Sequence, residues 1–319
     1  MLGHGEDKCF FGRRIRRGAA ALLPSFIIPR DQCRSMFESI GRSFALVKAS
    51  WQILTEDRKL LVFPVLSGIA TLVVVASFVL PLFLSGAVFG EAPAGKLPGI
   101  VYLFLFYVVC YFVAIFFNTG LITCVSAKLQ GRDATVGEGL SNAARHLPAI
   151  LAWAVIAATV GLILRIIGER SGLVGRIATA VVGGVWSLVT IFVVPVLVLE
   201  DRGVIGAVRE SAALFRKTWG ESVVGSVSLG LVFGAIVLLG AIGVVAAVFA
   251  GSLAVAALAV ALFIILVAAV AVVSSAMHGI FVVALYHYAR NGTVPGLFDR
   301  GLVEKAFVPK GPAFGAGNI

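Results

Sequence analysis

The chain has 319 residues, of which 60% are hydrophobic and 13% are charged, and its mean hydropathy is +1.04. The charged fraction is about half of what soluble domains carry, and one soluble core is too small to bury so much apolar surface. The composition therefore excludes an ordinary soluble enzyme, a disulfide-rich secreted protein and a disordered chain. It predicts an integral membrane protein with several transmembrane helices.

The first 35 residues differ from the rest of the chain. Two arginine pairs precede an apolar stretch, Gly18–Ile28, as in a signal peptide, but Pro24 and Pro29 interrupt it and no small-residue cleavage site follows. We predict a basic, disordered tail over residues 1–35, with Met36 as the native start. A twin-arginine export signal is the alternative that the arginine pairs leave open.

An amphipathic helix is predicted directly after this tail. Its apolar residues follow steps of three and four, which is the period of a helical stripe; they are Phe37, Ile40, Phe44, Val47, Trp51 and Leu54. Lys48 and Trp51 suit the headgroup layer of a membrane, where a cation and an indole ring both find partners. We therefore expect a cytoplasmic interfacial helix that either seals the bundle or contacts a protein partner or an anionic lipid.

Six transmembrane helices are predicted from the apolar runs, because about 20 apolar residues cross the hydrocarbon. The runs are Leu60–Phe89, Ile100–Ala127, Leu147–Leu164, Ile177–Leu199 and two within Ser222–Ala289. Three short crossings in the last region are an alternative, but they would place the C-terminal basic residues outside. We predict two long helices with a break near Gly251-Ser252.

The basic residues predict the orientation of these helices. With the N-terminus inside, 22 of the 26 lysines and arginines fall on the cytoplasmic side. This is the positive-inside pattern, and it predicts that both termini are cytoplasmic. The net charge of +10 is then explained by topology and by attraction to anionic headgroups, and not by binding to nucleic acid.

The chain contains an internal repeat at an offset of 168 residues. Ser43–Trp51 matches Ser211–Trp219 with Ser, Ala, Leu and Trp identical, and a fainter copy, Ser141–Ala143, precedes the third span. The repeat predicts a unit used three times, in which an interfacial helix is followed by a transmembrane hairpin. Arg216 and Trp219 become candidate partner contacts, as equivalents of Lys48 and Trp51.

Two end motifs resemble those of a known family. The first comprises Ser50–Leu54 and Asp57–Pro64, and the second comprises Ala284–Ala289, Val294-Pro295, Phe298-Asp299 and Ala306–Lys310. Over residues 36–310 the chain resembles an uncharacterised family of prokaryotic six-helix membrane proteins, a domain of unknown function. It is distantly similar to the membrane domain of glycerophosphodiester phosphodiesterases, whose catalytic domain is absent here. The resemblance implies a prokaryotic inner (plasma) membrane and supplies no catalytic or binding residues.

Polar residues inside the spans are the candidate intramembrane contacts, either between helices or along a transport path. They are Asn118, Thr119 and Thr123 in the second span and Ser274, Ser275 and His278 in the sixth. We expect Asn118 to face another helix and His278 to be buried and hydrogen-bonded to a neighbouring helix. Gly183-Gly184 and Trp186 predict a flexible break in the fourth span. No carboxylate lies at mid-membrane, which weakens the case for ion-coupled transport.

The sequence contains no motif for catalysis, metal binding or a cofactor. Its four histidines and four cysteines are scattered, without the spacing of metal ligands. We therefore predict no enzymatic activity, no metal site and no cofactor.

The predicted fold is all-α, with six transmembrane helices over residues 36–290 and a cytoplasmic tail over 291–319. We predict a non-enzymatic scaffold, or a protein that binds a protein partner or an anionic lipid. A second copy of the chain is one option for the partner. The alternative is a transporter or channel for a small or lipidic solute.

Overall fold

The computed structural model describes residues 48, 50–84, 97–249 and 252–291. All of them belong to one compact unit that begins at Glu38. Helices connected by short loops make up this described part, without a strand, so the all-α prediction is confirmed. The predictions for the tail 1–35, for the helical stripe before Lys48 and for the tail after Asn291 lie outside the described residues.

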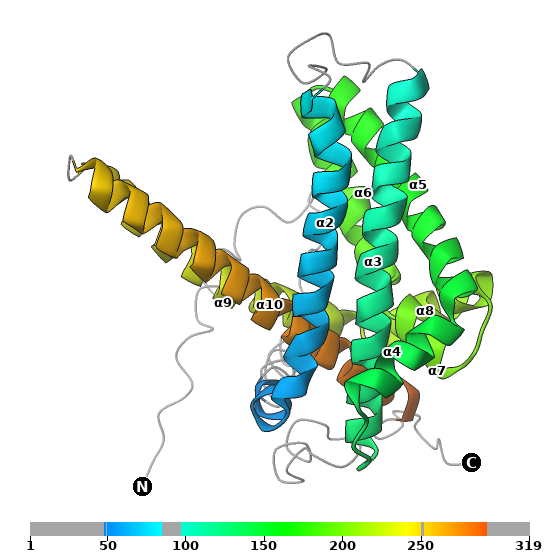
Figure 1. Ribbon diagram of the computed structural model, residues 1–319. Helices are drawn as coiled ribbons and strands as arrows, with labels where there is room; N and C mark the ends of the chain where they lie inside the picture. Colours follow the sequence, from blue (N-terminus) through cyan, green and yellow to red (C-terminus); the bar gives the residue numbers. More distant parts are fainter. Residues whose placement is uncertain (1–47, 49, 85–96, 250–251, 292–319) are drawn as a thin grey trace, which may run out of the picture. The chain divides into compact units, whose positions relative to one another are not determined.

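Six helical segments are long and apolar enough to cross a membrane (Figure 1), which confirms the predicted number. They are η2 with α2 (Arg58–Leu61, Val62–Leu84), α3 (Leu97–Leu129), α5 (Leu147–Arg170), α6 with α7 (Leu173–Val189, Val193–Leu199), α9 (Trp219–Phe249) and α10 (Leu253–Asn291). Helix α9 ends at Phe249 and α10 begins at Leu253, and Ser252 before α10 is not helical. The region after Ser222 therefore holds two long helices, as predicted.

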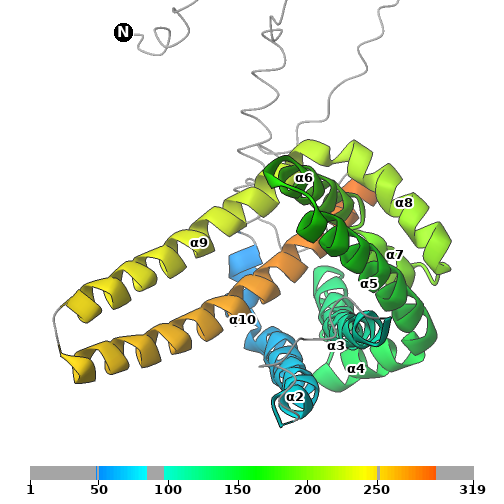
Figure 2. The same ribbon diagram turned by 90° about the horizontal axis from the view of Figure 1, so that it is seen from above.

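Helix α3 is central to the packing, because it contacts α2, α4, α5, α7 and α10. Helices α9 and α10 lie side by side and run antiparallel (Figure 2). The core forms where the last turns of α3, the whole of α7 and the second half of α10 meet. In α10 the buried side chains lie between Ala276 and His287, whereas large apolar residues in its first half are exposed.

The fourth span is broken, but not at the glycine pair that the sequence suggested. Gly183-Gly184 and Trp186 lie inside the continuous helix α6, and the break falls between Val189 and Val193. Two backbone groups at this break bond to Ser211 of α8 (Val204–Lys217): its hydroxyl donates to the Val189 carbonyl (2.6 Å) and accepts from the Phe192 N–H (3.1 Å). A distant serine thus stabilises the break, because freed backbone groups at membrane depth need partners.

We expect Ser211→Ala to lower the free energy of unfolding by about 2 kcal/mol, because two buried backbone groups lose their partner. Titration with SDS in mixed micelles measures this change. Ser77→Ala is the matched control, since the Ser77 hydroxyl bonds only within its own helix on an exposed face; a change within about 0.5 kcal/mol is expected there. Equal losses in both variants would contradict the role given to Ser211.

Each successive pair of spans is preceded by a short helix. Lys48 and Ser50–Glu56 are helical before η2, α4 (Val136–Arg145) precedes α5, and α8 precedes α9. Thr135 and Glu138 form a capping box that defines the start of α4.

Helix α8 packs one face against the core. This face consists of Ala207, Ser211 and Leu214, with Val208 and Phe215 half-buried beside it. It packs against α6 and α7, two of the helices that α8 contacts. Ile205 of α8 and Trp219, the first residue of α9, are exposed to the surroundings of the protein.

Candidate functional site

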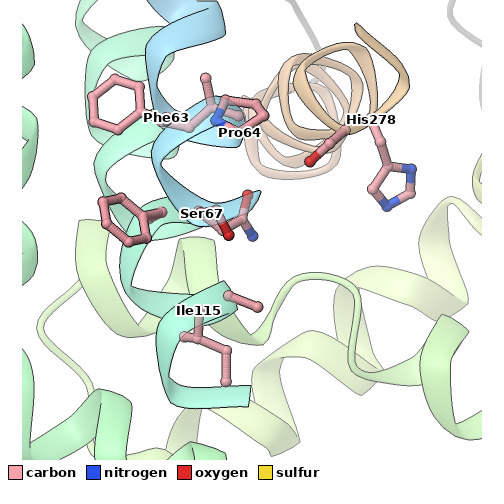
Figure 3. A pocket seen from close by; sticks show the side chains of 10 residues that line it. Phe63, Pro64, Ser67, Ile115 and His278 are labelled. Carbon is pink, nitrogen blue, oxygen red and sulfur yellow. The ribbon is translucent and has the colours of Figure 1, made fainter. Parts of the chain in front are cut away.

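A polar pocket of about 250 Å³ lies between α2, α3 and α10 (Figure 3). Three of the six polar residues expected inside the membrane line it: Asn118, Ser275 and His278, together with Ser67 of α2. Gly279 of α10 makes the approach to α3 close, because a Cβ built there would lie 3.5 Å from Asn118 Oδ1 and 2.5 Å from a methyl carbon of Leu121. Asn118 thus approaches α10, but its side chain is exposed and forms no hydrogen bond within the described residues, so its expected contact with another helix stays a prediction.

The structure differs from the expectation for His278 both in its burial and in its hydrogen bonding. Its side chain is exposed at the edge of the pocket, and it forms no hydrogen bond with any other residue that the structure describes. The reason lies in its neighbours: Ala276 and Gly279, both buried, form the side of α10 that packs against the other helices. Position 278 is therefore turned away from the helix contact.

The other three candidates lie elsewhere. Thr119 is fully buried, and its hydroxyl oxygen has no partner within the described residues. Ser274 is half-buried and does not line the pocket. Thr123 accepts a hydrogen bond from Asn142 Nδ2 (2.9 Å), which ties α3 to α4. The six residues therefore do not form a single path.

A second pocket, of about 420 Å³, lies where α3 and α4 face each other. Helix α3 supplies Thr123, Ser126, Ala127 and Gln130, the loop supplies Arg132 and Ala134, α4 supplies Glu138, Ser141, Asn142 and Arg145, and α7 supplies Val198 and Leu199. On both helices the lining follows steps of three and four, so one face of each borders the pocket. We call it the α3–α4 pocket.

A buried histidine that the sequence analysis did not single out borders this region. His287 of α10 shares a 3.1 Å hydrogen bond with Ser126 Oγ, which also accepts from Gln130 Nε2 at 3.2 Å. The contact joins α10 to the last turns of α3. The two residues are 161 positions apart in the chain, so no local pattern in the sequence indicates that they are in contact.

Four charged side chains form a closed ring of ion pairs at the ends of α7, α8 and α10. Glu200 pairs with Arg290 (2.6 Å) and Arg202 (2.8 Å), and Glu210 pairs with the same two arginines (2.9 and 3.4 Å). The Tyr286 hydroxyl also donates to Glu200 at 2.7 Å. Carboxylates and guanidinium groups alternate around the ring, so each charge has two partners of opposite sign. None of these four residues stands out in the sequence as a candidate for a site.

The residues expected at the headgroup layer border an apolar groove. Lys48 and Trp51 lie at a groove of about 540 Å³ between α9 and α10. Its other lining residues are all apolar; they are Leu229, Val232, Phe233, Ile236, Ala269, Val270, Val273 and Met277. We call it the α9–α10 groove.

Positions paired by the sequence repeat have similar environments. Trp51 and Trp219 are 50% and 65% exposed, whereas the preceding Ser50 and Thr218 are 0% and 1% exposed. Lys48 and Arg216 are both exposed. Each tryptophan therefore faces the surroundings of the protein while its small polar neighbour is packed inside.

Six apolar helices and the absence of strands in the described part define a multi-pass α-helical membrane protein. Residues 97–296 match a family of unknown function, DUF6159, and the chain belongs to this family. No curated protein and no solved structure matches the chain. The similarity to the phosphodiesterase membrane domain, and the opening motif before residue 97, remain predictions.

The described residues contain no group of three or more His, Cys, Asp or Glu side chains placed to hold a metal ion.

Proposed function

We propose that the protein is a non-enzymatic protein of a prokaryotic inner (plasma) membrane that binds an anionic phospholipid at the cytoplasmic face. The observation that carries this proposal is the α9–α10 groove, where a lysine and a tryptophan border an otherwise apolar surface. An acyl chain suits the apolar lining. The ammonium group of Lys48 and the ring of Trp51 suit the headgroup region.

The size of the groove supports this occupant. The lining runs from Leu229 to Ile236 on α9 and from Ala269 to Met277 on α10, which is about 10–12 Å at the helical rise of about 1.5 Å per residue. This length accommodates part of an acyl chain. The volume of about 540 Å³ is also typical of small-molecule sites, which span about 300–1,000 Å³.

The repeated short helices support a position at the membrane surface. Ile205 and Trp219 are exposed apolar side chains near the exposed, basic Arg216, and exposed apolar and basic side chains together are typical of a helix that lies in the headgroup layer. We propose that the helices before the first, third and fifth spans form this repeated interfacial unit, each followed by a hairpin. The distribution of basic residues supports cytoplasmic N- and C-termini.

The proposal predicts selective lipid retention. Protein in nanodiscs with equal phosphatidylglycerol and phosphatidylcholine is expected to keep mainly phosphatidylglycerol when ejected for native mass spectrometry. Lys48→Gln is expected to reduce that preference about fivefold, because one cation near an anionic surface contributes about 1 kcal/mol. Ile236→Trp is expected to reduce all retained lipid, since the indole fills the groove without changing the charge.

Lys59→Gln is the matched control. Lys59 is an exposed lysine eleven positions after Lys48, and it does not line the α9–α10 groove. Its variant is therefore expected to retain lipid as the native protein does. An equal loss in the Lys59 variant would show that diffuse charge, and not the groove, attracts the lipid. Equal retention of the two lipids by the native protein would refute the proposal.

One observation favours a second candidate function, transport of a small or lipidic solute. The pocket at Ser67, Asn118, Ser275 and His278 brings polar groups from three helices together within the spans. Scrambling of a fluorescent phosphatidylglycerol in proteoliposomes distinguishes the two functions. Lipid transport along this pocket requires that Asn118→Leu abolishes scrambling, whereas the lipid-binding proposal expects Asn118→Leu to leave phosphatidylglycerol retention unchanged.

A further inference from the structure

The α3–α4 pocket contains two guanidinium groups without a partner. Arg132 lies in the loop after α3, and Arg145 lies in the last turn of α4. Neither guanidinium group forms an ion pair or a hydrogen bond with another residue in the described ranges, yet both side chains line the same cavity of about 420 Å³. Arg165, Arg202 and Arg290 pair with carboxylates, whereas other exposed arginines such as Arg209 form no ion pair within the described residues but do not line this cavity. Two unpaired arginines at one cavity point to an anionic ligand.

Neutral donors and acceptors complete the lining. Ser141 is exposed, and its hydroxyl forms no hydrogen bond within the described part of the chain. Asn142 uses Nδ2 to bond Thr123, and Gln130 uses Nε2 to bond Ser126. These internal bonds fix the two facing helices, while the Ser141 hydroxyl and both guanidinium groups remain available to a ligand.

The charges around the pocket favour an anion. Glu138 is the acidic residue of the lining, and its carboxylate accepts from the Thr135 backbone N–H (3.4 Å) in the capping box of α4. Asp133 pairs with Lys128, and Asp201 pairs with His146. The nearby carboxylates thus have partners within the protein, whereas the two arginines do not.

From this geometry we infer that the α3–α4 pocket binds a phosphate group, carried by a small soluble molecule or by a lipid headgroup. Guanidinium groups bind phosphate through paired hydrogen bonds, and a phosphate offers enough oxygens for two arginines and a hydroxyl. A pocket of about 420 Å³ has room for a phosphate ester, which is larger than inorganic phosphate. This site is separate from the α9–α10 groove and shares no lining residue with it.

Two arms of one experiment test the site and separate the two sources of phosphate. In the first, glycerol 3-phosphate is titrated by calorimetry into the full chain in phosphatidylcholine nanodiscs. In the second, nanodiscs contain phosphatidic acid, and native mass spectrometry measures the phosphatidic acid that the protein retains. In whichever arm the native protein binds its ligand, the double variant Arg132→Gln/Arg145→Gln is expected to bind about tenfold more weakly or worse. The reason is that it removes charge-assisted hydrogen bonds.

Two controls make the result decisive. Arg209→Gln removes an exposed arginine of α8 that does not line the pocket, and it is expected to bind as the native protein does. Lys59→Gln, at an exposed lysine that lines neither the α3–α4 pocket nor the α9–α10 groove, is also expected to bind normally.

Binding in the first arm identifies a soluble phosphate ester, and binding only in the second identifies a lipid headgroup. Absence of binding in both arms, or an equal loss in Arg209→Gln, overturns the inference. The arginines are exposed and without internal partners, so an unchanged thermal unfolding midpoint in the double variant is the expected sign of an intact fold.

Discussion

Glu200→Ala is expected to lower the free energy of unfolding by about 3 kcal/mol, measured by SDS titration in mixed micelles. Glu200 is mostly shielded, with 12% of its side chain exposed, and it pairs with Arg202, Arg290 and the Tyr286 hydroxyl. Its removal leaves two guanidinium groups with a single carboxylate, Glu210, between them. Breaking a buried pair from one side typically costs about 3–5 kcal/mol, and the partly exposed arginines place this case at the lower end.

Two further variants separate charge from shape at this position. Glu200→Gln keeps the side-chain volume and an acceptor for Tyr286, so it is expected to lose less than Glu200→Ala but still more than 1 kcal/mol, roughly the upper limit for an exposed ion pair. Asp133→Asn is the control, because Asp133 is 86% exposed and lies 3.6 Å from Lys128; surface pairs contribute about 0–1 kcal/mol. A loss at Glu200 no larger than at Asp133 would show that the ring does not stabilise the fold.

Gly139→Ala and Gly137→Ala are expected to have opposite effects, although both lie in α4. A Cβ at Gly139 would lie 2.8 Å from the backbone oxygen of Gly120 and 2.9 Å from Cys124 Sγ. Because a backbone atom of α3 cannot rotate away, the helices must separate, at a cost of about 2 kcal/mol. At Gly137 the nearest neighbouring atom lies 3.9 Å away, and the better helix propensity of alanine is expected to stabilise by about 0.5 kcal/mol.

The same SDS titration measures both glycine variants. A destabilised Gly139→Ala beside a neutral or stabilised Gly137→Ala would confirm that close approach, and not backbone freedom, requires the glycine at 139. Destabilisation of similar size at both positions would contradict this explanation. The Gly139 variant is also expected to disturb the α3–α4 pocket, because α4 forms one of its walls.

The number of spans could be predicted from the sequence, because each apolar run is long enough by itself to cross a bilayer. The presence of two helices and not three after Ser222 could also be predicted, because three crossings would place the basic residues that follow α10 outside. Both features depend on local composition and length. Neither requires knowledge of which helices are neighbours.

The break in the fourth span could not be located from the sequence. Val189–Val193 is apolar on both sides, and the groups that stabilise the break come from Ser211 of a different helix. The orientation of His278 could not be predicted for a related reason. Helix α10 is apolar around most of its circumference, so the face that packs is chosen by the small residues Ala276 and Gly279 and not by polarity.

The polar sites show the same division between local and distant information. Asn118 was identified because an amide in an apolar run stands out by itself. The ring around Glu200 was not identified, since it joins positions 200–210 to Arg290 across two further spans. Ordinary charged residues at loop positions carry no local sign that they will meet.

The division of the fourth span has a consequence for how freely its two parts can vary. Helix α6 contains no buried residue, whereas six successive residues of α7, from Val193 to Val198, are buried. Side chains that face lipid need only be hydrophobic, but those in a close-packed interior must also fit in shape. One continuous apolar run thus holds two kinds of position. At the exposed positions of α6, leucine, isoleucine, valine and phenylalanine are interchangeable, whereas in α7 a single added methylene disturbs the packing of its neighbours.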